Sequence, residues 1–170
     1  MNRLYAPWRT QYIVENNKKK IQGCVFCHIV NNSSIENDKE LGVLYRDKDF
    51  FIVMNKYPYS PGHFMIIPNY HTANLEDLDE NVAMDIMAFA QKGIRLLKDI
   101  LNAQGVNIGM NLGKIAGAGI AEHIHLHLVP RWGGDTNFIT TVGDTRVYSS
   151  DFDEIYKKLK DNCADYFRRI

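Results

Sequence analysis

The sequence predicts an α+β domain whose sheet is mostly antiparallel and which carries one long helix and a helix near the C-terminus. Short apolar runs follow one another across residues 43–68 with only turns between them. Apolar side chains recur every three or four positions over residues 77–102, and again over residues 151–168. Consecutive strands with one long intervening helix favour this fold class over a parallel arrangement.

The expected elements follow in order along the chain. Residues 24–30 form a short apolar segment, and residues 31–38 have the polar composition of a loop. The turn at residues 47–49 joins two strands, residues 58–62 interrupt the pattern, and residues 113–119 form a glycine-rich loop. Five segments are expected to be strands, namely residues 43–45, 50–54, 63–68, 106–112 and 122–130.

Two helices complete the expected fold. The long helix is expected over residues 77–102, with Asn74 as its N-cap and Gly105 as its stop. The last helix is expected over residues 151–168, with Ser150 as its N-cap.

Composition narrows the class of protein. The chain has 170 residues, of which 45% are hydrophobic, and this suits one globular domain. Residues 1–22 have no clear period and are expected to be an N-terminal extension, and residues 23–170 one domain. Lys and Arg total 20 and Asp and Glu total 20, so we expect neither nucleic acid nor a membrane surface as a partner. With no signal-peptide or membrane-span pattern and only three cysteines, the chain is expected to be cytoplasmic.

Residues 122–131 carry the most informative pattern, three histidines that alternate with aliphatic residues. In a strand, His123, His125 and His127 would share one face, roughly 6.7 Å apart per step, while the aliphatic residues face the core. Three imidazoles fill a core poorly. We therefore expect this face to meet a metal, a phosphate or both.

Residues 123–129 resemble the signature of the histidine triad (HIT) superfamily, and the resemblance extends over most of the chain. Further matches are Asn55, residues 61–63, Pro68, His71 and residues 109–113. Residues 4–9, 24–27 and 130–138 resemble a narrower bacterial group that includes a diadenosine tetraphosphate phosphorylase and stands close to the fragile histidine triad hydrolases. The resemblance implies a HIT-like fold.

Neutral imidazole can attack the phosphorus of a phosphoanhydride, and the central position makes His125 the natural nucleophile. His127 can hydrogen-bond a phosphate oxygen or the leaving group, Asn111 offers an amide donor, and the backbone of residues 117–119 can cradle an anion. The resemblance likewise implies His125 as nucleophile and Asn111 as phosphate contact. Phosphorylase relatives can place a serine where Gly119 stands here, so only backbone contact is expected at Gly119.

These residues predict an enzyme that cleaves dinucleoside polyphosphates, such as diadenosine tetraphosphate, through a nucleotidyl-histidine intermediate discharged by water or inorganic phosphate. A purine nucleoside phosphoramidase is an alternative within the same class. A nucleotide-binding regulator with slow turnover is an alternative of another class. A protein that binds metal through all three triad histidines is disfavoured, because ligands on one flat strand converge poorly on a tetrahedral ion.

The resemblance also implies a purine nucleotide pocket. Asn55 matches the position that contacts the ribose hydroxyls, and the slot for the purine ring is matched by Val25, Phe26, Ile29 and Val53. The alternative is that these four residues are ordinary core and that Asn55 is a turn residue before Pro58.

Cys24 and Cys27 form a Cys-x2-Cys pair, which in an intracellular protein is half of a structural zinc site. Cys163 stands alone, so the remaining ligands must be imidazoles. The resemblance implies that these are His71 and His123, and hence that Zn²⁺ is a structural cofactor. Two buried thiols without metal, or His28 as a rival ligand, remain alternatives. His63 is expected to be structural, hydrogen-bonded in the wall of the site.

The long helix is apolar over more than the ~100° that a single core contact requires. The residues concerned are Met84, Ile86, Met87, Phe89, Ile94, Leu96 and Leu97. The resemblance implies a twofold homodimer with this helix and a strand at the interface, in which residues 132–138 or 4–9 approach the partner's site. The alternative is a monomer in which all of these apolar residues pack into the core of the same chain.

Overall fold

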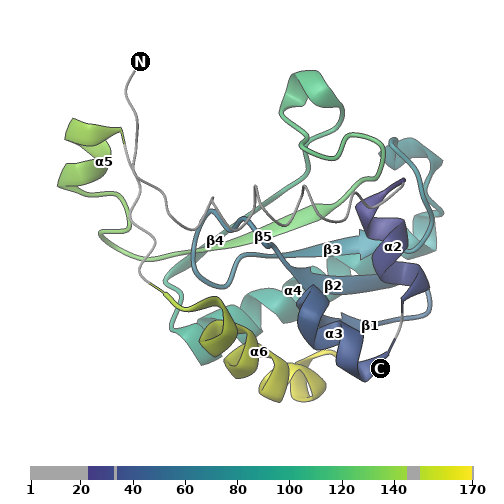
Figure 1. Ribbon diagram of the computed structural model, residues 1–170, viewed down its shortest axis with the longest axis horizontal. Helices are drawn as coiled ribbons and strands as arrows, with labels where there is room; N and C mark the ends of the chain where they lie inside the picture. Colours follow the sequence, from purple (N-terminus) through teal and green to yellow (C-terminus); the bar gives the residue numbers. More distant parts are fainter. Residues whose placement is uncertain (1–22, 33, 145–149, 170) are drawn as a thin grey trace.

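The computed structural model describes residues 23–32, 34–144 and 150–169. In it, a five-stranded antiparallel sheet has helices on both faces (Figure 1), which confirms the α+β class. The expectations for residues 1–22, including those for residues 4–9, lie outside the described residues. The division of the chain into an extension and one domain therefore stays a prediction.

The strand order is β1-β2-β3-β5-β4. Every side chain of β2 and β3 is buried, because these strands are central and covered on both faces. The strands span β1 Val43–Arg46, β2 Phe50–Met54, β3 Phe64–Pro68, β4 Gly105–Gly109 and β5 Leu126–Arg131.

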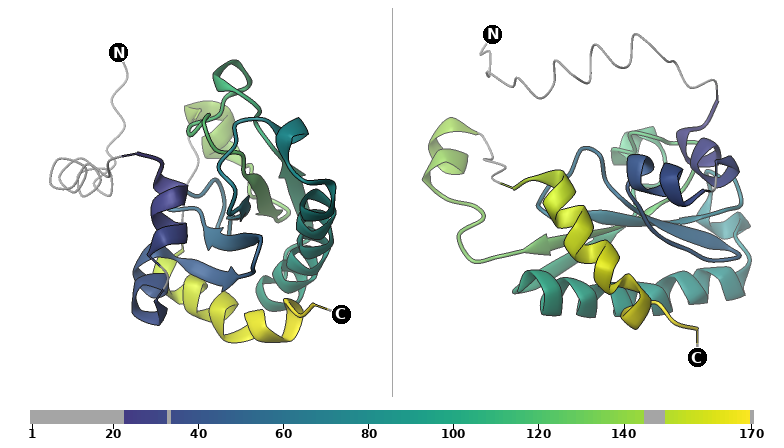
Figure 2. Two further views of the ribbon diagram at one scale, coloured as in Figure 1. Left: turned by 90° about the vertical axis from the view of Figure 1, so that its right-hand side faces the viewer. Right: turned by 60° about the horizontal axis from the view of Figure 1, so that its bottom comes forward.

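Two apolar clusters form the core, one on each face of the sheet. The larger lies under α4 (Glu80–Leu101) and α6 (Phe152–Tyr166), and it includes the aliphatic residues that alternate with the triad histidines. The smaller lies under α2 (Val25–Asn31). Figure 2, left, shows α2 and α4 on opposite sides of the sheet. Met65 belongs to the smaller cluster and pairs directly with His127, so His127 faces α2.

Some expected boundaries were wrong. Residues 35–38 are not loop but belong to α3 (Ile35–Leu41), because Ser34 accepts a hydrogen bond from the Asn37 N–H and caps the helix. The short apolar segment at residues 24–30 forms α2. Another helix, α5 (Phe138–Gly143), was not expected.

The long helix begins later than expected, at Glu80, because Asp79 is its N-cap and not Asn74. A separate 3-10 turn, η1 (Leu75–Asp77), precedes it. The helix ends at Leu101, where Asn102 adopts the left-handed conformation that Gly105 was expected to supply. Likewise Asp151, and not Ser150, caps α6.

Both strands near the triad are shorter than expected. β4 ends at Gly109, and the glycine-rich loop contains a 3-10 turn, η2 (Lys114–Ala116), which projects away from the sheet in Figure 1. β5 begins only at Leu126. No helix in the part of the chain that the structure describes has the length and apolar character needed to cross a bilayer.

Candidate functional site: a buried histidine triad beside a cysteine–histidine cluster

The three triad histidines share the α2 side of the sheet, but they do not all lie in one strand. Only His127 lies in β5, while His123 and His125 precede that strand. The backbone leaves the sheet there because the Ile124 N–H donates to the Thr72 carbonyl instead of to a neighbouring strand. The ring centroids of His125 and His127 lie 4.8 Å apart, less than the roughly 6.7 Å per step expected for a regular strand, and the rings are nearly perpendicular.

His125 is buried, and one of its ring nitrogens is committed to the backbone. Its Nδ1 lies 2.9 Å from the carbonyl oxygen of His123. A carbonyl oxygen can only accept, so Nδ1 carries the hydrogen and Nε2 retains its lone pair. The neutral ring thus has the tautomer that a nucleophile requires.

His127 is held by a second buried histidine. The Tyr59 backbone N–H donates to Nδ1 of His63 at 3.1 Å, so His63 must carry its hydrogen on Nε2. That Nε2–H lies 2.9 Å from Nδ1 of His127 and donates to it, which places the hydrogen of His127 on Nε2. His127 therefore presents a donor beside His125.

Burial keeps both of these rings neutral. It lowers the pKa of His63 to about 3 and that of His127 to about 4, with the neighbouring triad histidines adding to the shift. Tyr59 also lies against the pair, with its ring centroid 4.8 Å from that of His63. The role of His63 in the site wall is as expected, but sequence reasoning missed that it sets the tautomer of His127. Only the pairing of β3 with β5, which the sequence pattern does not reveal, would have indicated the contact between His63 and His127.

Asn55 lies at the edge of this network. Its side-chain amide lies 3.3 Å from His63 Nδ1, and its Oδ1 accepts from the Tyr57 N–H at 2.9 Å. The hydrogen bond from the Tyr57 N–H is that of a turn residue, whereas the contact with His63 brings the Asn55 side chain to the site. The contact of Asn55 with a ribose stays a prediction.

The other expected nucleotide contacts differ in burial. Asn111 follows β4 and is half-buried, whereas Gly119 is exposed in the glycine-rich loop, with open space where a Cβ would stand. Three of the four slot residues, Phe26, Ile29 and Val53, are buried in the smaller cluster, and only Val25 is exposed. The roles of these residues toward a nucleotide stay predictions.

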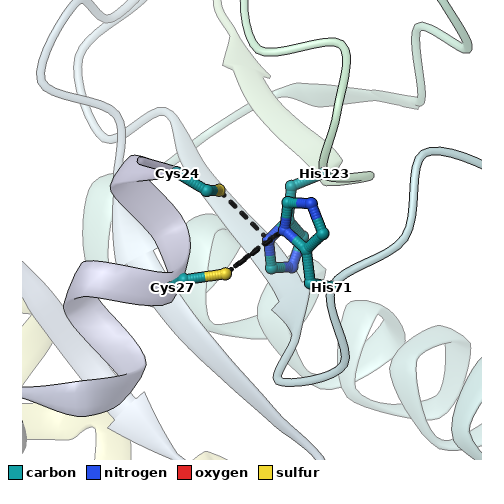
Figure 3. Close-up of side chains that lie close together, drawn as sticks. All are labelled: Cys24, Cys27, His71 and His123. Carbon is teal, nitrogen blue, oxygen red and sulfur yellow. Dashed lines mark hydrogen bonds between the residues drawn. The ribbon is translucent and has the colours of Figure 1, made fainter. Parts of the chain in front are cut away.

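Cys24, Cys27, His71 and His123 converge at one end of α2, with one ligand atom of each within 4.8 Å of all the others (Figure 3). Cys24 is the N-cap of α2 and Cys27 lies in its first turn, so both sulfurs point the same way. The two histidine Nδ1 atoms lie 3.2 Å apart. Each sulfur lies close to a histidine Nδ1, at 3.4 Å for Cys24 to His123 and 3.2 Å for Cys27 to His71.

These separations suit the donor set of a tetrahedral metal. Zinc bonds of about 2.0–2.1 Å to nitrogen and about 2.3 Å to sulfur give tetrahedron edges of about 3.3 Å between nitrogens and about 3.6 Å between nitrogen and sulfur. Nε2 of His123 lies 2.9 Å from the Pro68 carbonyl and donates to it, which leaves the Nδ1 lone pair facing the cluster. Burial lowers the pKa of His123, and the neutral ring is the form that binds metals. The cluster could therefore hold a metal ion.

The rival ligands lie elsewhere. His28 is exposed on α2, with its Nδ1 3.3 Å from the amide of Asn32, and it is not part of the cluster. Cys163 is buried in the larger core, where burial raises its pKa to about 12. A thiol with that pKa is inert at neutral pH.

Comparison with known proteins places this arrangement in a family. A HIT domain model matches residues 36–134. An AP-4-A phosphorylase of Mycobacterium tuberculosis is 41% identical over 149 residues, which cover 86% of this chain and 76% of the relative. An adenosine 5'-monophosphoramidase of Saccharomyces cerevisiae is 31% identical over 141 residues, covering 83% of this chain and 81% of the relative. Among solved structures, a zinc-bound histidine triad family protein from Mycobacterium smegmatis superposes on this chain with a TM-score of 0.68. The two sequences are 31% identical, and the superposition covers 84% of this chain and 94% of the relative.

Proposed function

The chain belongs to the HIT domain family, and from that premise we propose that it is a nucleotidyl hydrolase or transferase that cleaves dinucleoside polyphosphates such as diadenosine tetraphosphate. The observation that carries the proposal is the buried His125, whose Nδ1 is bound to a carbonyl and whose Nε2 is left with its lone pair. The similarity to a relative named AP-4-A phosphorylase supports the substrate class.

In the first step, Nε2 of His125 attacks the phosphorus next to one nucleoside. The nitrogen–phosphorus bond forms, the phosphoanhydride oxygen–phosphorus bond breaks, and the remaining polyphosphate leaves as an anion. The hydrogen on Nδ1 stays in place and keeps its bond to the His123 carbonyl, which stabilises the positive charge on the substituted ring. Nε2–H of His127 donates a hydrogen bond to the departing oxygen without having to transfer its proton.

In the second step, an oxygen of water or inorganic phosphate attacks the same phosphorus. The nitrogen–phosphorus bond breaks and restores the neutral His125, and a water nucleophile releases its proton to solvent. Asn111 and the backbone at Gly119 would donate to phosphate oxygens during both steps. The absence of a serine hydroxyl at Gly119 leaves the acceptor open between water and phosphate.

We propose that the nucleotide binds between α2 and the triad. Val25, Phe26, Ile29 and Val53 would line the purine slot, and Asn55 would contact the ribose. The position of Phe26 supports this assignment, because its ring centroid lies 5.1 Å from that of His125.

We further propose that the cysteine–histidine cluster holds a structural Zn²⁺, as its donor set and spacing favour. When bound, the ion would cross-link α2 to the loops that precede α4 and β5. The zinc-bound relative from M. smegmatis supports the identity of the metal. Elemental analysis of protein purified without chelator should give one zinc per chain, and absence of bound metal would reject the site.

The homodimer is a further proposal. Of the seven apolar residues expected to exceed a single core contact on α4, Met84 and Met87 are 62% and 50% exposed, whereas the other five lie in or against the larger core. These two methionines are the apolar side chains of the seven that a dimer interface would cover. Trp132, in contrast, is half-buried, and its indole N–H donates to the Leu101 carbonyl at the end of α4 in the same chain. Within residues 132–138, Phe138 at 76% exposed is thus the better candidate to reach a partner. Light scattering at micromolar concentration should give a dimer, and a monomer would reject the proposal.

A phosphoramidase is the second candidate, favoured by the similarity to the yeast enzyme. Diadenosine tetraphosphate should be incubated with and without inorganic phosphate in ¹⁸O-water. Phosphate-dependent formation of ADP and ATP indicates a phosphorylase, and ATP with ¹⁸O-labelled AMP indicates a hydrolase. Turnover of adenosine 5'-phosphoramidate alone would replace the main proposal by the second candidate.

A further inference from the structure

Phe26 connects the cysteine–histidine cluster with the nucleophile. It lies between Cys24 and Cys27 in the first turn of α2, and it is 4% exposed. Its ring meets the His123 ring edge-on at a centroid distance of 5.5 Å and an interplanar angle of 88°. The same ring lies 5.1 Å from the ring of His125. One side chain thus touches both a metal-site residue and the proposed nucleophile.

The two ends of α2 are held in different ways. Near its C-terminal end, the Ile29 carbonyl accepts a hydrogen bond from Arg46 at 3.0 Å, and Arg46 is itself paired with Asp38. At the N-terminal end, the side chain of Cys24 makes no capping hydrogen bond among the described residues. Besides the backbone hydrogen bond from the His28 N–H to the Cys24 carbonyl, the first turn is held by the packing of Phe26 and by what the two sulfurs bind.

We propose that Phe26 is a positioning residue through which a metal bound at the cysteine–histidine cluster orients His125 and the nucleotide slot, so that metal and nucleotide bind with positive coupling. The inference rests on the proposed nucleotide site. A metal that ties both sulfurs to His71 and His123 fixes the first turn of α2, and with it the ring of Phe26. The slot is then ordered before a nucleotide binds, so nucleotide binding loses less conformational entropy and its affinity is higher.

Coupling of this kind is reciprocal. If the metal raises the affinity for a nucleotide by some factor, the nucleotide raises the affinity for the metal by the same factor. Coupling between two sites in one domain is commonly about 5-fold to 150-fold, and we expect about tenfold here.

The first measurement uses AMP and zinc. AMP affinity is determined by calorimetry on the zinc-loaded protein and on protein stripped by chelation, whose fold is checked by near-ultraviolet circular dichroism. AMP should bind about tenfold more weakly without zinc, and saturating AMP should lower the free zinc concentration at half-occupancy by the same factor. Equal AMP affinity in folded protein with and without zinc would overturn the inference alone. Failure of the zinc-loaded protein to bind AMP would overturn the proposed function, and the inference with it.

The second measurement uses variants and holds even if the stripped protein unfolds. Phe26→Leu keeps an apolar side chain but loses the ring contacts with His123 and His125. It should bind zinc normally and AMP more weakly, because the ring also lines the proposed slot, and it should show little shift of zinc affinity with AMP. The zinc affinities of the wild-type protein and of Phe26→Leu are measured with AMP at the same multiple of each protein's own Kd for AMP. His28→Ala, exposed on the same helix, is the matched control and should retain the full shift. An undiminished shift in Phe26→Leu would overturn the inference.

Discussion

His123 and His125 are two residues apart in the chain, yet they present opposite nitrogens to their surroundings. The Nε2–H of His123 donates a hydrogen bond to the Pro68 carbonyl, so the Nδ1 lone pair faces the cysteines. The Nδ1–H of His125 donates a hydrogen bond to the His123 carbonyl, so the Nε2 lone pair is left for the proposed substrate. The same side chain thus presents Nδ1 where we propose a metal and Nε2 where we propose attack on a phosphorus. Backbone carbonyls, and not residue type, therefore decide which ring nitrogen is available.

The largest expected effect tests the nucleophile side of this comparison. His125→Ala removes the only nitrogen proposed to form the covalent intermediate, so turnover of diadenosine tetraphosphate should fall by about 10³-fold or more. AMP binding should be largely retained, because the slot residues are unchanged. Steady-state kinetics and calorimetry measure the two quantities. A variant that keeps more than about a tenth of the wild-type rate would contradict the assignment.

The next effect tests the metal side. Cys27→Ala removes one donor of the cysteine–histidine cluster, so the purified protein should lose its zinc and its free energy of unfolding should fall by more than about 2 kcal/mol. Elemental analysis and urea denaturation report these changes. His28→Ala serves as control and should keep both metal and stability. A Cys27→Ala protein with unchanged stability would argue against a structural metal.

A third prediction concerns the hydrogen bond that sets the tautomer of His127. His63→Leu leaves Nδ1 of His127 buried without its donor, so kcat should fall about tenfold to 100-fold. His63→Gln can donate from its amide to the same nitrogen and should recover part of the loss. Equal rates for the two variants would mean that His63 acts only by filling space.

The smallest effect is on the dependence of stability on pH. Both imidazoles titrate near pH 6.5 in an unfolded chain, whereas burial lowers the pKa of His63 to about 3 and that of His127 to about 4 in the folded protein. Below pH 6.5 the unfolded chain therefore takes up protons that the folded chain does not. The stability that comes from keeping these rings neutral is fully present above about pH 6.5, and it is lost as the pH falls toward the pKa values of the folded protein. Each ring lowers the free energy of unfolding by at most about 1.4 kcal/mol per pH unit over this range.

Urea denaturation between about pH 7 and about pH 4.5 measures this slope. His63→Leu removes one of the two titrating rings, so its stability should fall less steeply with decreasing pH. A steeper fall in the variant would show that other groups dominate acid unfolding.

Much of the fold followed from local patterns in the sequence. Short apolar runs between turns predicted β1, β2 and β3, and the helical periods predicted α4 and α6. A strand that is covered on both faces is apolar throughout, whereas a helix with one buried face repeats its apolar residues every three or four positions. Boundaries were less accurate. Competing polar residues stand side by side at the helix starts, and only the folded backbone shows that Asp79 and Asp151 accept the capping hydrogen bonds.

The sequence pattern predicted the residues to which we assign the chemistry of the site. The spacing of the histidines named His125 as the central imidazole. The Cys-x2-Cys pair, with the family resemblance, gave the same four residues that converge in space. The hydrogen-bond partners and tautomers of these residues, in contrast, depend on the folded chain. Whether His123 and His125 continue β5, which nitrogen each ring presents, and that Phe26 touches both rings all depend on contacts with segments distant in sequence, at Thr72, Pro68 and α2. A local pattern contains no information on such contacts, because it records only which face of a segment is apolar and not what that face meets.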